Sequence, residues 1–129
     1  MSAHVVAVQA MIDCYNRMDG DGLLTILDAE CRHTTPGSDF GTDKVGSATI
    51  VEYFKQNVFP SFNRVQFDVK HLYEDTAQGV VIVEWKSTLW PKTGKNYGND
   101  GAFVIEFKNG RISWVREYFD TEKSNKNVN

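Results

Sequence analysis

The spacing of apolar residues changes once along this chain, and the change comes near Pro60. Over residues 2–18 and 48–54, apolar side chains recur every three or four positions, which predicts amphipathic helices. Over residues 65–74 they alternate with polar side chains, which predicts a half-buried strand. Helices followed by strands favour an α+β domain, with the helices packed on one face of an antiparallel sheet.

The first half is expected to be helical, with one short strand. Ser2 is suited to cap the first helix, and the Asp-Gly-Asp-Gly cluster at residues 19–22 ends it. The elements expected here are a helix over 2–18, a short helix over 23–27, a strand over 31–35, a polar loop over 37–46, and a helix from 48 to near Pro60.

The second half is expected to hold four strands joined by hairpins. Asn109-Gly110 is a strong signal for a two-residue hairpin turn. Such a sheet, if it curls, encloses a pocket between itself and the helices. The expected strands cover 65–74, 80–90, 97–107 and 111–119, and a polar, frayed tail follows over 121–129.

The composition is that of one soluble domain. The chain has 129 residues, 41% of them hydrophobic and 24% charged, with a net charge of −3. No apolar run approaches the roughly 20 residues of a membrane helix, and the charge does not favour nucleic acid or anionic lipid. Cys14 and Cys31 lack the spacing of a zinc site, so we expect buried, reduced thiols, no metal, and a cytoplasmic location.

The last predicted hairpin carries a family resemblance. Residues 103–120, FVIEFKNGRISWVREYFD, resemble the last hairpin of the nuclear transport factor 2-like superfamily, and more narrowly of its SnoaL-like branch. That branch holds polyketide cyclases and limonene epoxide hydrolases, and the order of elements fits over residues 3–120. The resemblance implies a curved antiparallel sheet of four to six strands, which forms a cone closed by three N-terminal helices around an apolar pocket. Because this scaffold carries many chemistries, function has to be argued from the site.

The resemblance also implies a homodimer formed through the outer face of the sheet. On the last strand, Trp114, Arg116 and Tyr118 share one face. Large aromatic residues and Arg on a face that no helix covers suit such an interface. The alternative is that the two aromatic side chains pack under a helix.

Glu117 is the first candidate for a catalytic residue. In limonene epoxide hydrolases, an acid at the matching place in a Trp-Arg-Asp-Tyr-Phe-Asp motif faces the pocket and takes part in catalysis. The resemblance therefore implies a pocket carboxylate here, one methylene longer. Desolvation of such a carboxylate suits general acid or base chemistry. The alternative is a structural Glu that pairs with a neighbouring Arg or Lys.

The other catalytic residues of the epoxide hydrolases, and those of the ketosteroid isomerases, are not present at the matching positions of this chain. Epoxide hydrolases of this branch use an Arg-x-Asp pair on the preceding long strand, where this chain has Glu84-Trp85-Lys86 or, with a one-residue gap, Val83 and Trp85. Ketosteroid isomerases need a Tyr and two acids, and the matching residues here are Met11, Thr35 and Phe103. The sequence therefore argues against both activities.

The histidines are the next candidates. His71 lies on the apolar face of the predicted strand 65–74, and a neutral imidazole beside Glu117 would form an acid–base pair. His33, on the short first strand, has similar standing, although a lone His on an apolar face is more often a core residue. The expected ligand-binding side chains are Tyr15, Trp85, Asn99, Phe103, Val115 and Phe119.

These observations predict a dimeric domain whose pocket takes a small, mainly apolar organic molecule. An enzyme of this kind would catalyse cofactor-free isomerisation, cyclisation, dehydration or hydrolysis. The first alternative is a ligand-binding or interaction module of the same fold that has no catalytic activity. The second is a protein-interaction domain without a pocket, because Phe67, Trp85, Trp90 and Phe103 are large enough to fill the core.

Overall fold

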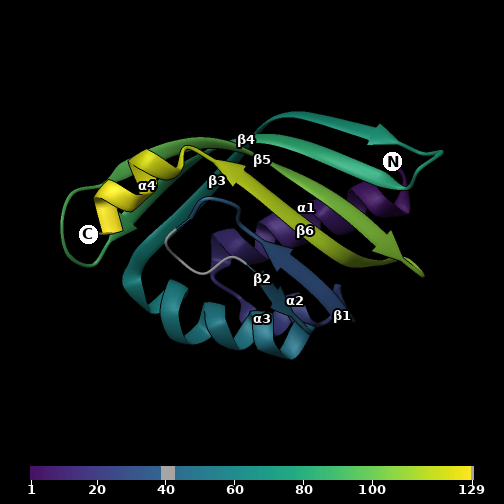
Figure 1. The fold of residues 1–129 in the computed structure, drawn as a ribbon, viewed down its shortest axis with the longest axis horizontal. Coiled ribbons are helices and arrows are strands. Elements are labelled where there is room, and N and C mark those ends of the chain that lie inside the picture. The colour runs from purple at the N-terminus through teal and green to yellow at the C-terminus, as the bar shows by residue number, and fades with distance from the viewer. Residues whose placement is uncertain (39–42, 129) are drawn as a thin grey trace.

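The computed structural model describes residues 1–38 and 43–128, with side chains described as far as residue 124. Figure 1 shows a layer of helices against one side of a twisted sheet, with the last helix beyond the end of the last strand. The helical elements are α1 (Ala3–Arg17), α2 (Gly20–Leu24), α3 (Ser47–Tyr53), the π-helical segment η1 (Phe54–Val58), the 3-10 turn η2 (Phe59–Ser61) and α4 (Thr121–Val128). The strands are β1 (Leu27–Thr34), β2 (Asp43–Val45), β3 (Phe62–Asp75), β4 (Val80–Pro91), β5 (Tyr97–Lys108) and β6 (Arg111–Phe119).

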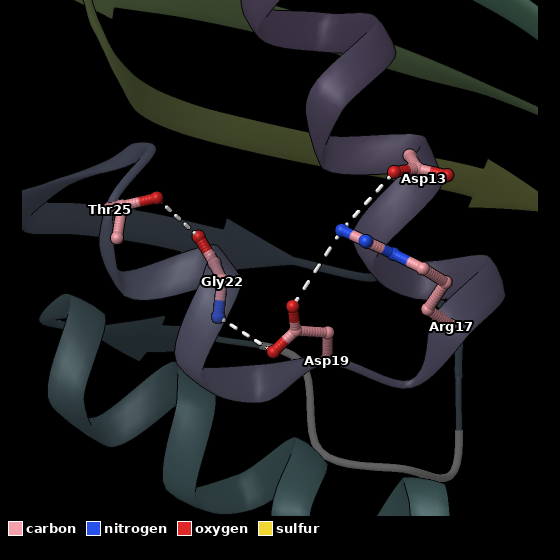
Figure 2. Close-up of polar contacts among 5 residues, drawn as sticks. All are labelled: Asp13, Arg17, Asp19, Gly22 and Thr25. Carbon is pink, nitrogen blue, oxygen red and sulfur yellow. Dashed lines mark hydrogen bonds and ion pairs between the residues drawn. The ribbon is translucent and has the colours of Figure 1, made fainter.

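Side-chain caps fix the corner between α1 and α2 (Figure 2). The Asp19 side chain accepts a 2.9 Å hydrogen bond from the Gly22 amide and so caps α2, and the Thr25 hydroxyl donates to the Gly22 carbonyl at 2.7 Å. The Arg17 guanidinium lies 3.2 Å from Asp13 and 3.7 Å from Asp19. The Asp-Gly cluster thus ends the first helix and begins the second.

The sheet is mixed and open, whereas the sequence predicted an antiparallel sheet. Its strand order is β2-β1-β6-β5-β4-β3. The pairing of β1 with β6 is parallel and every other pairing is antiparallel. Periodicity is a local property, so it does not reveal that β1 pairs with the last strand, or that the chain crosses from one edge of the sheet to the other between β2 and β3.

A bulge in β3 reverses which residues face the helices. From Arg64 to Val69 each residue has its own partner on β4, but the register then steps from the Val69–Trp85 pair to the His71–Glu84 pair. The extra residue moves every later side chain to the other face. Leu72 therefore packs against the core, while His71 is exposed. The prediction that His71 lies on the inward face is wrong for this reason.

The core lies between the sheet and α1, α2 and α3. Cys14 and Cys31 are both buried and free. Burial raises the pKa of the Cys31 thiol from 9.0 to about 12. The largest fully buried side chains include Met11, Leu23, Ile50, Phe103, Ile105 and Ile112. No helix in residues 1–38 and 43–128 is both long enough and apolar enough to span a membrane.

The polar C-terminal segment is helical, whereas the sequence predicted a frayed tail. Asp120 accepts a 3.1 Å hydrogen bond from the Lys123 amide in the first turn of α4. Ser124 is buried, and its hydroxyl accepts a 2.6 Å hydrogen bond from Asn99 on β5. The helix is thus anchored by a contact between residues that are far apart in sequence. The predicted loop over 37–46 contains β2, and its residues 39–42 lie outside the described residues.

Candidate functional site

A cavity of about 430 Å³ lies between the helical layer and the inner face of the sheet. Its volume falls within the roughly 300–1,000 Å³ typical of small-molecule sites. Much of the lining is aromatic and includes Tyr15, Phe54, Phe59, Phe67, Trp85 and Phe119. Its polar side chains include His33, Lys44, Ser87, Asn99, Glu117 and Ser124.

His33 and Glu117 meet in this cavity from neighbouring strands. Thr34 on β1 pairs with Arg116 on β6, so the residues on either side of that pair face inward together. His33 Nε2 lies 3.4 Å from Glu117 Oε1, and the two side chains are 8% and 17% exposed. His33 is the one ion-pair or hydrogen-bond partner that the described residues give this carboxylate. The imidazole that lies beside Glu117 is therefore that of His33 and not that of His71.

The His33 imidazole lines the cavity beside the carboxylate. His33 Nε2 is buried and has no well-aligned hydrogen bond with any described residue. The Phe54 ring packs edge-on against the imidazole, with the centroids 5.5 Å apart. A ligand in the cavity can therefore reach both Glu117 and His33, since both side chains line it.

Tyr15 extends from α1 toward the same carboxylate. Its ring is buried and lies 5.4 Å from Phe54 and 5.8 Å from Phe67, centroid to centroid. Burial raises the pKa of Tyr15 well above 10.0, and the charge of Glu117 raises it further. The hydroxyl is therefore held neutral and can donate a hydrogen bond to a ligand.

Lys44 is a cavity residue that the sequence analysis missed. It lies directly opposite His33 in the β1–β2 pairing, and its Nζ is 3.8 Å from the centroid of the Tyr53 ring. Burial lowers the pKa of Lys44, an effect that the charge of Asp43 partly offsets. The strand that carries Lys44 has only three residues, which is too short for alternation of apolar and polar residues to reveal it. The sequence pattern therefore predicts a polar loop at this position.

Asn99 lines the cavity, but its amide is largely engaged within the protein. Its Nδ2 donates to the Asp120 carbonyl at 3.0 Å and to the Ser124 hydroxyl at 2.6 Å, while Oδ1 accepts from the Asp100 amide at 2.8 Å. These bonds hold α4 against β5. The side chain therefore supports the cavity wall by anchoring this helix.

Phe103 and Val115 lie in the core and are not among the cavity-lining residues. They are 0% and 1% exposed, and the Phe103 ring packs 5.4 Å from Trp85. Both side chains are therefore part of the hydrophobic core, and the prediction that they bind the ligand directly is not supported by the lining of the cavity.

The inner face of β4 carries Trp85 and Ser87, both buried, while Glu84 and Lys86 are exposed on the outer face. The cavity-facing positions of this strand therefore supply neither an Arg nor an Asp. Trp85 Nε1 is buried without a hydrogen-bond partner among the described residues. Those residues also contain no group of three His, Cys, Asp or Glu side chains placed to hold a metal ion.

The fold and the matched region define the class of protein. The model of the SnoaL-like domain family matches residues 8–115, and the chain belongs to this family. The family resemblance inferred from residues 103–120 is confirmed. No curated protein sequence matches the chain.

Solved structures share the fold at low sequence identity. An NTF2-like protein of unknown function from Burkholderia pseudomallei K96243 superposes with a TM-score of 0.86 and 21% identity, over 98% of this chain and 97% of the other. TerC, co-crystallised with polyporic acid, superposes with a TM-score of 0.84 and 18% sequence identity, over 97% of each chain. An LEH-like epoxide hydrolase from M. tuberculosis superposes with a TM-score of 0.76 and 20% sequence identity, over 96% of this chain and 87% of the other. At these identities the likeness is one of fold.

Proposed function

We infer that this chain is a cofactor-free acid–base enzyme acting on a small, mainly apolar organic molecule, with Glu117 as the acid or base. The observation that carries the proposal is a carboxylate in an aromatic-lined cavity, backed by an imidazole at 3.4 Å. A carboxylate and an imidazole this close can act together in a reaction that takes a proton from the ligand and returns one to it.

The residues around the pair narrow the reaction class. In this proposal Glu117 is the acid or base, His33 assists it from the neighbouring strand, and Tyr15 supplies a neutral hydroxyl that orients the ligand. The two cysteines lie in the core, away from the lining, so they do not supply a nucleophile to the cavity. These features support proton-transfer reactions, namely isomerisation, cyclisation, dehydration or hydrolysis.

We do not propose the mechanism of the limonene epoxide hydrolases for this chain. One structural neighbour is described as an LEH-like epoxide hydrolase. The inner face of β4 here offers Trp85 and Ser87 where those enzymes place an Arg-x-Asp pair. A hydrolysis at this site would have to activate water with Glu117 and His33 alone.

The test is a thermal-shift screen of the wild type, Glu117→Gln and Glu84→Gln against small epoxides, enones, aromatic polyketide fragments, polyporic acid and apolar amines. Glu84→Gln is the matched control because it removes an exposed carboxylate from the outer face of β4. A ligand at 100 times its Kd stabilises the folded state by about 2.7 kcal/mol. We expect one class to stabilise all three proteins and to be turned over by the wild type and Glu84→Gln. Binding without turnover by any of them would support a non-catalytic binding module instead.

We also propose that the protein is a homodimer formed through the outer face of the sheet, and that it is cytoplasmic. The outer-face cluster of Trp114, Arg116 and Tyr118 supports the dimer. The guanidinium carbons of Arg32 and Arg116 lie 4.4 and 4.7 Å from the centroid of the Trp114 ring, and Tyr118 is 45% exposed. Sedimentation of the wild type and of Tyr118→Glu tests the dimer, since a charge at the interface should yield monomers.

A further inference from the structure

We propose that the Ser87 hydroxyl, on the inner face of β4, forms a subsite of the cavity that donates a hydrogen bond to a carbonyl oxygen of the substrate. The substrate is then an elongated aromatic molecule with an uncharged carbonyl group at the end away from Glu117. This inference rests on the proposed function of the same cavity and adds the substrate class. The subsite orients the ligand, and the reaction takes place at Glu117.

Ser87 is a buried polar residue whose hydroxyl has no partner within the protein. The residue is 2% exposed and lies in the lining of the cavity. Its hydroxyl forms no hydrogen bond with the residues that the structure describes. Buried polar groups are rarely left unpaired in folded proteins, so this one depends on the contents of the cavity for a partner. A Ser hydroxyl has one hydrogen to donate, and it rotates to suit an acceptor.

A second hydroxyl lies beyond Asn99, the direct cross-strand partner of Ser87. Asn99 Nδ2 donates to the Ser124 oxygen at 2.6 Å and to the Asp120 carbonyl at 3.0 Å, so its amide hydrogens are engaged. Ser124 accepts the first of these bonds, which leaves its own hydroxyl hydrogen for a ligand, and it also lines the cavity. This end of the cavity therefore presents hydroxyl donors, which suit a ligand oxygen that accepts.

The wall around Ser87 carries no charge among the described lining residues. The acidic and basic side chains of that lining are His33, Lys44 and Glu117, which come from β1, β2 and β6. Moving an ion out of water costs much more than moving a neutral carbonyl group that gains a hydrogen bond, unless an opposite charge is present. The subsite therefore favours a carbonyl group over a carboxylate.

The pairing of the strands separates Ser87 from Glu117. Glu117 pairs with Phe103 on β5, and Phe103 pairs with Val83 on β4. Ser87 lies further along β4 by about 14 Å, and β4 lies about 10 Å from β6 across the sheet. The two groups therefore line different parts of the cavity. A ligand that touches both is elongated, with its apolar middle against the aromatic lining.

The experiment compares two probes of nearly the same shape, 2-acetylnaphthalene and 2-isopropenylnaphthalene, by isothermal titration calorimetry. The ketone has a carbonyl oxygen where the alkene has a methylene group, so the ratio of their Kd values isolates the oxygen. We expect Ser87→Ala to lower the relative affinity for the ketone about fivefold, the effect of one net hydrogen bond. Ser113→Ala is the matched control, since Ser113 on β6 is not among the cavity-lining residues, and it should keep the wild-type ratio.

Stability without ligand gives an independent readout. Because the Ser87 hydroxyl has no partner within the protein, Ser87→Ala should unfold at the wild-type Tm or slightly above it. A hydroxyl that stabilised the fold through a hydrogen bond would lower the Tm by several degrees when removed. A fall of that size would overturn the subsite.

The outcomes separate this inference from the proposed function. An unchanged ratio in a folded Ser87→Ala, or no binding of either probe by the folded wild type, overturns the subsite and leaves the Glu117 proposal to its own turnover test. A ratio that falls in Ser87→Ala, together with full turnover by Glu117→Gln, supports the subsite and contradicts the catalytic role of Glu117.

Discussion

An added methyl group at Gly101 on β5 is expected to lower the free energy of unfolding substantially. The residue pairs with Trp85 on β4 and with Phe119 on β6. A Cβ placed there would lie 2.5 Å from Trp85 Cζ2 and 2.7 Å from Cη2, and it would also overlap the backbone oxygen of Tyr118. Carbon atoms in contact are normally about 3.5–4.0 Å apart. Gly101→Ala therefore forces both a buried ring and a neighbouring strand to move.

The size of the effect follows from how little either group can yield. Trp85 is 2% exposed and is packed by Phe67 at 4.9 Å and Phe103 at 5.4 Å, centroid to centroid. Overpacking typically costs about 1–3 kcal/mol, and the backbone overlap favours the upper end of that range. Replacing Gly by Ala within a strand recovers about 0.5–1 kcal/mol of backbone entropy. The net expectation is a loss of about 2 kcal/mol.

Urea denaturation followed by tryptophan fluorescence measures this loss, and thermal unfolding should show a Tm lower by roughly 4–10 °C. Trp85→Phe in the Gly101→Ala background should recover part of the loss, because it removes the two ring atoms and leaves the strand overlap. An Ala variant as stable as the wild type, or more stable, would refute the close packing of Trp85 on Gly101. Because Trp85 lines the cavity, ligand binding should weaken together with stability.

Three further predictions concern the core, the last helix and the first corner. Burial raises the pKa of the Cys31 thiol from 9.0 to about 12. The neutral buried thiol therefore contributes its full stability to the folded state below pH 9, and this stability is lost as the pH rises from 9 to 12. At about 1.36 kcal/mol per pKa unit, Cys31→Ala should remove up to about 4 kcal/mol of the alkaline loss of stability, and unchanged pH dependence would contradict this. Asn99→Ala removes the two hydrogen bonds to α4, so hydrogen exchange over residues 121–128 should accelerate relative to the rest of the chain. Asp19→Ala should cost about 0.5–2 kcal/mol of unfolding free energy by removing the α2 cap, whereas Asp13→Ala, at an exposed ion pair, should change it by less than about 1 kcal/mol.

The sequence predicted those features that depend on local pattern. The first helix, the four long strands and the Asn109-Gly110 turn all follow from spacing and turn chemistry, and each is present. Alternation along β6 also put Glu117 on the face opposite Trp114, and the family resemblance implied that this face lines the pocket. From Trp114 onward the register with β5 has no shift, so the alternation of this part of the strand holds.

Features that depend on pairing could not be predicted. The bulge after Val69 turns His71 outward, and nothing in the alternation of β3 announces it. The parallel pairing that brings His33 beside Glu117 joins strands about 80 residues apart. Lys44 joins the lining of the cavity only because β2 pairs with β1. The candidate site is thus assembled mainly by long-range contacts between strands, although several of its residues were recognised one by one.

The most direct test of the account is the turnover of the best-bound compound by the wild type and by Glu117→Gln, with Kd measured in parallel. The substitution keeps the size of the side chain and removes its titrating group. We expect Kd to change less than about threefold and turnover to fall by roughly 10²–10⁴, the range that general acid–base catalysis contributes. Equal turnover by Glu117→Gln would contradict the assignment of this carboxylate as the acid or base.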